Sequence, residues 1–91
     1  MGVIHLEIHG RVQGVGFRWF VKQQARALGL RGWISNKPNG NVELAAAGDT
    51  EALEKLARVA EKGPPGAVVE SVTKLPPPDE ESLPNPFGIV R

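Results

Sequence analysis

The sequence predicts an α+β domain in which one antiparallel sheet carries two helices on a single face. Two observations lead to this prediction. Segments with the two-residue period of strands alternate along the chain with two segments that have the helical period of about 3.6 residues. An Asn-Gly pair at residues 39–40 separates the second and third strand-like segments, and such a pair favours a tight hairpin between antiparallel strands.

The first half of the chain is expected to form a strand, a helix and a second strand. In residues 3–9 apolar and polar side chains alternate strictly, as they do in a half-buried strand. From Phe17 to Leu28 the apolar side chains recur at helical spacing, and Gly29 suits the C-terminal cap of that helix. Residues 30–36 have the pattern of a strand again.

After the hairpin, a further strand is expected at residues 41–47 and a second helix from about Thr50 to Lys62. Asp49 or Thr50 suits the N-cap of this helix. The Gly-Pro-Pro-Gly stretch that follows ends the helix, because proline cannot continue it. The core-facing stripe of the helix is predicted to consist of Leu53, Leu56, Val59 and Ala60.

The C-terminal part is expected to add a fourth strand, a loop and a short edge strand. The valines of residues 67–75 do not share one parity, and a β-bulge would explain this change of phase. Residues 76–86 are too rich in proline for regular structure and are expected to form a surface loop, before the short strand at 87–91. The order βαββαβ is that of a ferredoxin-like sandwich, a fold that hosts many unrelated functions.

Composition narrows the class of protein. The 91 residues are enough for one small domain, residues 1–91. Eleven Lys and Arg against ten Asp and Glu leave a formal charge of +1, which argues against a nucleic-acid partner bound through a basic patch. The chain has no cysteine, so disulfides, thiol catalysis and cysteine metal sites are excluded. No apolar run suits a membrane span or a signal peptide, and we therefore expect a cytoplasmic protein without a membrane partner. The sequence gives no reason to expect an oligomer, so we expect a monomer.

The segment GRVQGVGFR, residues 10–18, joins the first expected strand to the first expected helix and contains three glycines. Glycine tolerates positive φ and lets a ligand approach the backbone closely. A glycine loop that opens into a helix can turn several N–H groups towards one point and so form an anion site. The alternative is a tight connection that needs glycine for its geometry alone.

Arg18 is the second unusual feature of this loop. A cation in the first turn of a helix is electrostatically misplaced by about 0.3–1 kcal/mol, and a residue that breaks a local rule is a candidate functional residue. Arg18 beside the loop N–H groups would suit a phosphate, although many arginines are simply solvated. The loop lacks the Gly-Lys-Ser/Thr of a Walker A motif, and Trp19 stands where a dinucleotide motif needs a small residue.

Together Gly10, the stretch VQGV at 12–15 and the pair Phe17-Arg18 resemble the signature loop of the acylphosphatases. The stretches LGLRGWISN at 28–36 and GPPGAVVESV at 63–72, and the closing FGIVR, are also similar to that family. Acylphosphatases are small ferredoxin-like enzymes that hydrolyse carboxyl phosphates to a carboxylate and inorganic phosphate. The resemblance covers nearly the whole chain.

The resemblance implies a role for individual residues. It implies that Arg18 and the loop amides bind the phosphoryl group, and that Asn36 orients the attacking water. It implies a small acyl phosphate as substrate, phosphate as product and competitive ligand, and no cofactor or metal. Ser35 departs from the family, whose members often carry a larger polar or basic residue there. The substrate-binding residues that it implies are Gln13, Gly14, Val15, Gly16, Phe17 and Arg18.

Other readings of these residues remain open from the sequence. His5, Glu7 and His9 share one face of the first strand, where we expect solvated side chains rather than a metal site. Trp19 and Trp33 are expected to pack against the domain rather than to line the rim of a site. Asn36, taken alone, has the pattern of a turn residue before Lys37-Pro38.

Two other functions fit the same topology. An RNA-recognition domain stacks bases on aromatic side chains of its central strands, and the exposed parity of the expected strands carries none. An anion-binding or regulatory domain would keep the loop without turnover, and acylphosphatase-like domains also occur inside larger maturation enzymes that handle carbamoyl phosphate. The length of the chain favours a freestanding enzyme, and the presence of both Arg18 and Asn36 favours catalysis.

Overall fold

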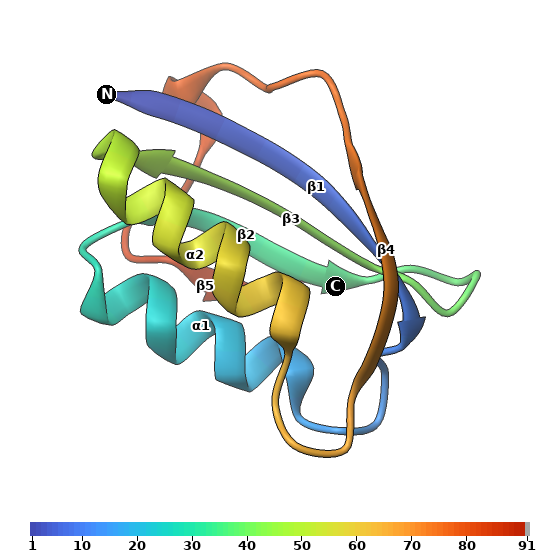
Figure 1. The fold of residues 1–91 in the computed structure, drawn as a ribbon. Coiled ribbons are helices and arrows are strands. Elements are labelled where there is room, and N and C mark those ends of the chain that lie inside the picture. The colour runs from blue at the N-terminus through green and yellow to red at the C-terminus, as the bar shows by residue number, and fades with distance from the viewer. Residues whose placement is uncertain (91) are drawn as a thin grey trace.

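The computed structural model describes residues 1–90, which form a ferredoxin-like α+β sandwich (Figure 1). Both helices cover one face of a five-stranded sheet whose strand order is β4-β1-β3-β2-β5. The elements are β1 (Gly2–Arg11), α1 (Phe17–Ala27), β2 (Arg31–Asn36), β3 (Val42–Gly48), α2 (Thr50–Lys62), β4 (Val68–Lys74), a 3-10 turn (Glu80–Ser82) and β5 (Gly88–Ile89).

The sheet is mixed rather than wholly antiparallel. Strand β5 runs parallel to β2, with Trp33 opposite Gly88 and Ile34 opposite Ile89, whereas the other neighbouring strands are antiparallel. The reason lies in the connection after β4, which leaves one edge of the sheet and returns to the opposite edge. This connection is held to β2 where Gly32 donates its N–H to the carbonyl of Pro84 over 2.8 Å. The final strand therefore enters the sheet in the same direction as β2.

The expected bulge is confirmed, and it lies at Glu70. His9 of β1 is opposite Ser71, but the next residue, Gly10, is opposite Val69, so Glu70 is left without a partner in β1. Gly10 has φ 134°, and a Cβ on it would lie 2.1 Å from the carbonyl oxygen of Val68. Only glycine fits at this point, because both the backbone conformation and the neighbouring strand exclude a side chain.

Replacing Gly10 by alanine is therefore expected to lower the free energy of unfolding by about 3 kcal/mol or more, through strain and a forced separation of β1 from β4. Gly14→Ala is the matched control, because Gly14 also has positive φ (76°) but a Cβ there would meet nothing within 4 Å. Its expected loss is about 1–2 kcal/mol, the conformational penalty alone. Urea unfolding of the two variants checks the difference, and equal losses would show that the contact with Val68 does not matter.

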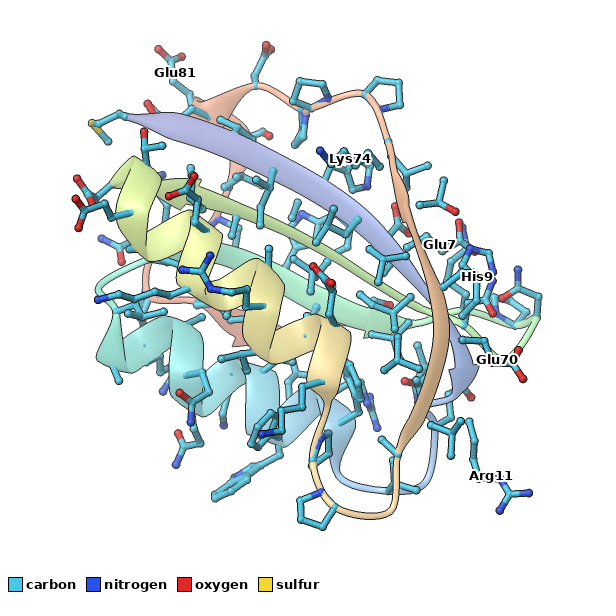
Figure 2. All side chains as sticks on the ribbon, in the orientation of Figure 1. Glu7, His9, Arg11, Glu70, Lys74 and Glu81 are labelled. Carbon is cyan, nitrogen blue, oxygen red and sulfur yellow. The ribbon has the colours of Figure 1, made fainter. Side chains whose placement is uncertain are left out.

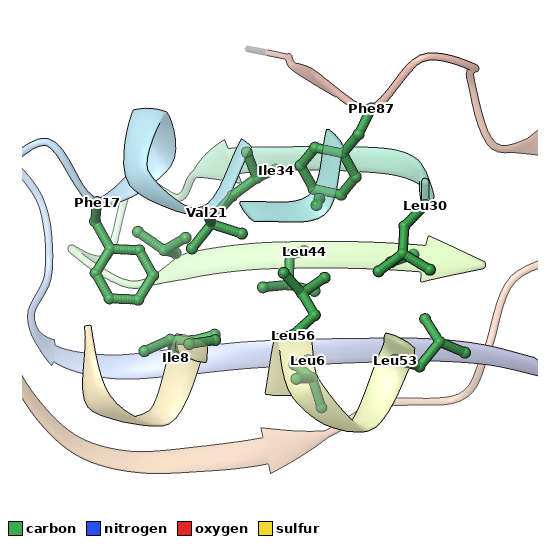
Figure 3. Close-up of a cluster of buried hydrophobic side chains, with 14 of the residues drawn as sticks. Leu6, Ile8, Phe17, Val21, Leu30, Ile34, Leu44, Leu53, Leu56 and Phe87 are labelled. Carbon is green, nitrogen blue, oxygen red and sulfur yellow. The ribbon is translucent and has the colours of Figure 1, made fainter. Parts of the chain in front are cut away.

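The hydrophobic core lies between the sheet and the two helices (Figure 3). The predicted core stripe of α2 is correct except at Val59, which is only half-buried. Ala52, which the sequence pattern did not include, is buried instead. Phe87, which directly follows the proline-rich segment, is also fully buried in this core. The largest fully buried side chains are Phe17, Phe87, Ile8, Ile34, Leu44, Leu56, Leu83, Val12, Val21 and Val42.

The expectation of a purely surface loop at residues 76–86 is wrong for Leu83. This side chain is 1% exposed and packs against Ala45 and Ala47 on the face of the sheet that the helices leave open, with Trp33 beside it. The guanidinium of Arg31 donates to the carbonyl of Leu83 from Nε over 2.9 Å and also from Nη2, which fixes the segment in place. No helix within residues 1–90 has the length and apolar character needed to cross a membrane.

Candidate active site

The glycine loop turns into α1 without any side-chain cap. Gly16 occupies the N-cap position in the left-handed conformation (φ 77°), and the first turn holds no acidic residue. Within residues 1–90, the N–H groups of residues 13–19 donate to no protein acceptor. The other helix differs, because the Asp49 carboxylate caps α2 by accepting from the N–H groups of Glu51 and Ala52. The partial positive charge at the start of α1 is thus left for an anion.

A pocket of about 150 Å³ opens at this point of the molecule. It lies where the loop after β1, the first turn of α1, the end of β2 and β5 meet. A Cβ on Gly14 or on Gly16 would meet no protein atom within 4 Å, so both glycines leave the backbone open to close approach. The residues that line the pocket are Val12, Gly14, Gly16, Phe17, Arg18, Trp19, Asn36 and Ile89.

Two of the expected binding residues, Gln13 and Val15, are not part of this lining. Val15 packs against the hydrophobic core, and the Gln13 side chain is bound elsewhere. Larger hollows lie beside β4, one of them of about 410 Å³ between the start of β1 and α2. These hollows contain neither the glycine loop nor Arg18, so we place the candidate site at the smaller pocket.

Arg18 lies half-buried in the pocket wall. Within the described part of the chain its guanidinium makes no ion pair and no hydrogen bond, since the ion pairs there join His5 and Lys37 to Glu43. Its five N–H donors are therefore available to a ligand, in a planar arrangement that suits two oxygens of one phosphate.

Asn36 is the last residue of β2 and is paired with Val42 of β3, which fixes its backbone. Its side-chain oxygen Oδ1 is buried, and no donor from residues 1–90 reaches it. A buried polar atom without a partner costs about 1–3 kcal/mol, so such atoms are rare and need an explanation. An amide in this state, in the same pocket as the uncapped start of α1, is well suited to hold a small polar molecule.

Gln13 joins the loop to the hairpin that follows Asn36. Its amide Nε2 donates to the carbonyl oxygens of Lys37 and Asn41, over 2.8 Å in each case. The same two residues close the hairpin, because the N–H of Lys37 donates to the carbonyl of Asn41 over 2.8 Å. The Gln13 side chain therefore fixes the distance between the loop that carries Arg18 and the strand end that carries Asn36.

Polar side chains on the open face of the sheet support this hairpin, next to which Glu7 and His9 lie (Figure 2). The Asn41 amide donates to the Glu7 carboxylate over 2.6 Å and lies 3.1 Å from Nδ1 of His9. The hydrogen bond from Asn41 is the main cause that holds the pKa of Glu7 below its usual range, and a hydrogen bond from the Asn39 amide adds to it. The hairpin is thus anchored on two sides, by Gln13 and by this face of β1.

The two histidines of β1 are bound to protein groups rather than simply solvated. Nε2 of His5 lies 2.6 Å from Glu43, and Nε2 of His9 lies 3.1 Å from the Thr73 hydroxyl. Among residues 1–90, no three His, Cys, Asp or Glu side chains are grouped so that they could hold a metal ion. The histidines therefore stabilise the sheet surface.

The two tryptophans differ from each other. Trp33 packs as expected, against the cluster of Leu83 and edge-on to the ring of His5 at a centroid distance of 5.8 Å. The same expectation is wrong for Trp19, which is 59% exposed and lines the pocket. Buried helix positions 17, 21 and 25 are spaced by one turn, and position 19 lies away from that stripe. Helical spacing therefore carried a usable signal for its exposure.

Residues 4–89 match the family model described as acylphosphatase. The chain belongs to the acylphosphatase family. An acylphosphatase of Thermococcus kodakarensis is 53% identical over 68 residues, which make up 75% of each chain. An acylphosphatase of Thiobacillus denitrificans is 47% identical over 72 residues, or 79% of this chain and 81% of that protein.

Solved structures agree with this assignment. The crystal structure of acylphosphatase from Bacillus subtilis matches with a TM-score of 0.84 at 35% identity, over 98% of both chains. A crystal structure of full-length HypF in its phosphate- and nucleotide-bound form matches with a TM-score of 0.76 at 28% identity, over 99% of this chain but 12% of HypF. Membership of the acylphosphatase family supports a hydrolase that acts on acyl phosphates.

Proposed function

We propose that this chain hydrolyses acyl phosphates in the pocket between the glycine loop and the end of β2. The observation that carries the proposal is the meeting of three unpartnered groups in one pocket: the loop N–H groups, the Arg18 guanidinium and the Asn36 amide. The loop amides and Arg18 bind the phosphoryl oxygens, and Asn36 orients the attacking water. Phosphoryl transfer depends mainly on such positioning and on charge stabilisation.

The chemistry needs no further side chain. The water oxygen forms a new bond to phosphorus, while the bond between phosphorus and the acyl oxygen breaks and its electron pair leaves with the carboxylate. A carboxylate is a good leaving group, so it requires no general acid. No residue that lines the pocket has a carboxylate or imidazole side chain, and the proton of the water therefore passes to a phosphate oxygen of the substrate. We propose that the reaction proceeds without a metal ion.

The test is the release of benzoate from benzoyl phosphate by the purified protein in excess EDTA. We expect turnover well above the spontaneous rate and no change in rate between EDTA and added Mg²⁺. Loss of activity in EDTA would contradict the metal-free mechanism. A folded protein that binds phosphate but does not accelerate hydrolysis would favour the anion-binding or regulatory domain instead.

We propose that Gln13 acts through its side chain as a positioning residue. Gln13→Ala removes two hydrogen bonds between loop and hairpin, and we expect a loss of about 1–2 kcal/mol in the free energy of unfolding. Because the reacting groups would then be less well aligned, kcat should fall about tenfold to a hundredfold.

The matched control is Gln23→Ala, which removes the same amide from an exposed position of α1 outside the pocket. Steady-state kinetics and urea unfolding measure both variants. An unchanged kcat in folded Gln13→Ala would show that the hairpin contact does not position the site. The monomeric state and the cytoplasmic location stay predictions.

A further inference from the structure

Trp19 is a large aromatic side chain that lies exposed at the candidate active site. Its side chain is 59% accessible, and it belongs to neither cluster of buried hydrophobic residues. It lines the same pocket as Arg18 and Asn36. Large aromatic rings contribute most to stability or to binding when their surface is buried. An indole left exposed at a pocket therefore suggests that a ligand buries it.

A second apolar side chain stands at the same pocket. Ile89 of β5 is 39% exposed and lines the pocket together with Trp19 of α1, although the two residues are far apart in the sequence. The pairing of β5 with β2 holds Ile89 opposite Ile34, directly beside the strand that ends in Asn36. The pocket thus combines polar groups for an anion with two exposed apolar groups.

We propose that Trp19 and Ile89 form a subsite for the acyl group and give the enzyme a preference for aromatic acyl phosphates. This inference rests on the proposed function. The substrate has a charged phosphoryl end, which the loop and Arg18 bind, and an acyl end with no charge of its own. An aromatic acyl ring stacks on the indole and contacts Ile89, whereas an acetyl group is too small to cover either side chain.

The kinetic test compares benzoyl phosphate with acetyl phosphate. The ratio of their kcat/KM values is measured in the wild type, in Trp19→Ala and in Trp19→Phe. Because each variant is compared with the wild type, the intrinsic reactivities of the two substrates cancel. From the usual binding energy of a pair of aromatic rings, the ratio of kcat/KM for benzoyl phosphate to that for acetyl phosphate should fall about threefold to tenfold in Trp19→Ala. It should recover in Trp19→Phe.

Val68→Ala is the control, because Val68 is 55% exposed but lies outside the pocket lining. Its ratio should equal that of the wild type. A ratio that is unchanged in Trp19→Ala, or a loss shared equally by both substrates, would overturn the proposal.

A binding experiment separates the subsite from the proposed function. Phenylphosphonate and methylphosphonate cannot be hydrolysed as acyl phosphates, and calorimetry gives their affinities directly. We expect phenylphosphonate to bind the wild type more tightly, and this advantage to shrink about threefold to tenfold in Trp19→Ala. If that pattern holds in a protein without turnover, the subsite stands and the proposed hydrolysis fails. If hydrolysis is observed but the two phosphonates bind equally well, the subsite fails alone.

Discussion

Arg18→Ala is expected to lower kcat/KM for benzoyl phosphate by about 10³-fold or more, the range reported for arginines that stabilise charge in phosphoryl transfer. The reason is that Arg18 is the one guanidinium that lines the pocket and that, among residues 1–90, it has no carboxylate partner. Removing the guanidinium weakens the binding of the substrate and also the stabilisation of the transition state, so KM should rise as kcat falls. Steady-state kinetics at constant ionic strength measure both parameters.

Arg58→Ala is the control for the loss of one positive charge, because Arg58 is exposed on α2 and lies outside the pocket. It should retain wild-type kinetics. Arg18→Lys should restore little activity, since an ammonium group cannot make the two parallel hydrogen bonds of a guanidinium. Full activity in Arg18→Lys would mean that Arg18 supplies only a charge and no directed contacts.

Asn36→Ala is expected to lower kcat by about 10²-fold to 10³-fold, comparable to the loss of one oriented polar group in other active sites, with little change in KM. The amide is assigned to the attacking water, which matters in the transition state more than in the bound substrate. Stopped-flow or steady-state assays of benzoate release give both constants. A large rise in KM at unchanged kcat would assign Asn36 to substrate binding instead.

The stability of the Asn36 variant offers an independent check. Because Oδ1 of Asn36 is buried without a protein donor in the described chain, its removal should change the free energy of unfolding by less than about 1 kcal/mol. Asn41→Ala is the contrast, since the Asn41 amide bonds to Glu7 and lies beside His9 and should be needed for stability. A strongly destabilised Asn36→Ala would indicate a structural role for that amide.

Most of the fold followed from local patterns. The alternation in β1, the Asp49 cap of α2 and the change of valine parity in β4 each reflect a rule that acts over a few residues, and the structure confirms all three. The parallel pairing of β5 and the burial of Leu83 and Phe87 depend on where a long proline-rich connection crosses the sheet. No local pattern specifies such a path.

In the candidate site, too, some features could be predicted from local sequence and others depended on the folded structure. Glycines next to a helix start, together with a misplaced arginine, indicated an anion site from Arg18 and its neighbours alone. The participation of Asn36 came from the family resemblance, because its position beside the loop results from the pairing of β2 within the sheet. The hydrogen bonds of the Gln13 side chain and the place of Trp19 in the pocket required the folded structure, since both depend on distant segments.

The most direct test of the central claim is the affinity for inorganic phosphate of the wild type, Arg18→Ala and Asn36→Ala, measured by calorimetry in one buffer. The account predicts that phosphate binds the wild type and Asn36→Ala about equally well, because the loop amides and Arg18 hold the anion. It predicts that binding is at least tenfold weaker in Arg18→Ala, in line with the loss of a charge-assisted clamp. Phosphate affinity that survives in Arg18→Ala and is lost in Asn36→Ala would contradict this division of roles.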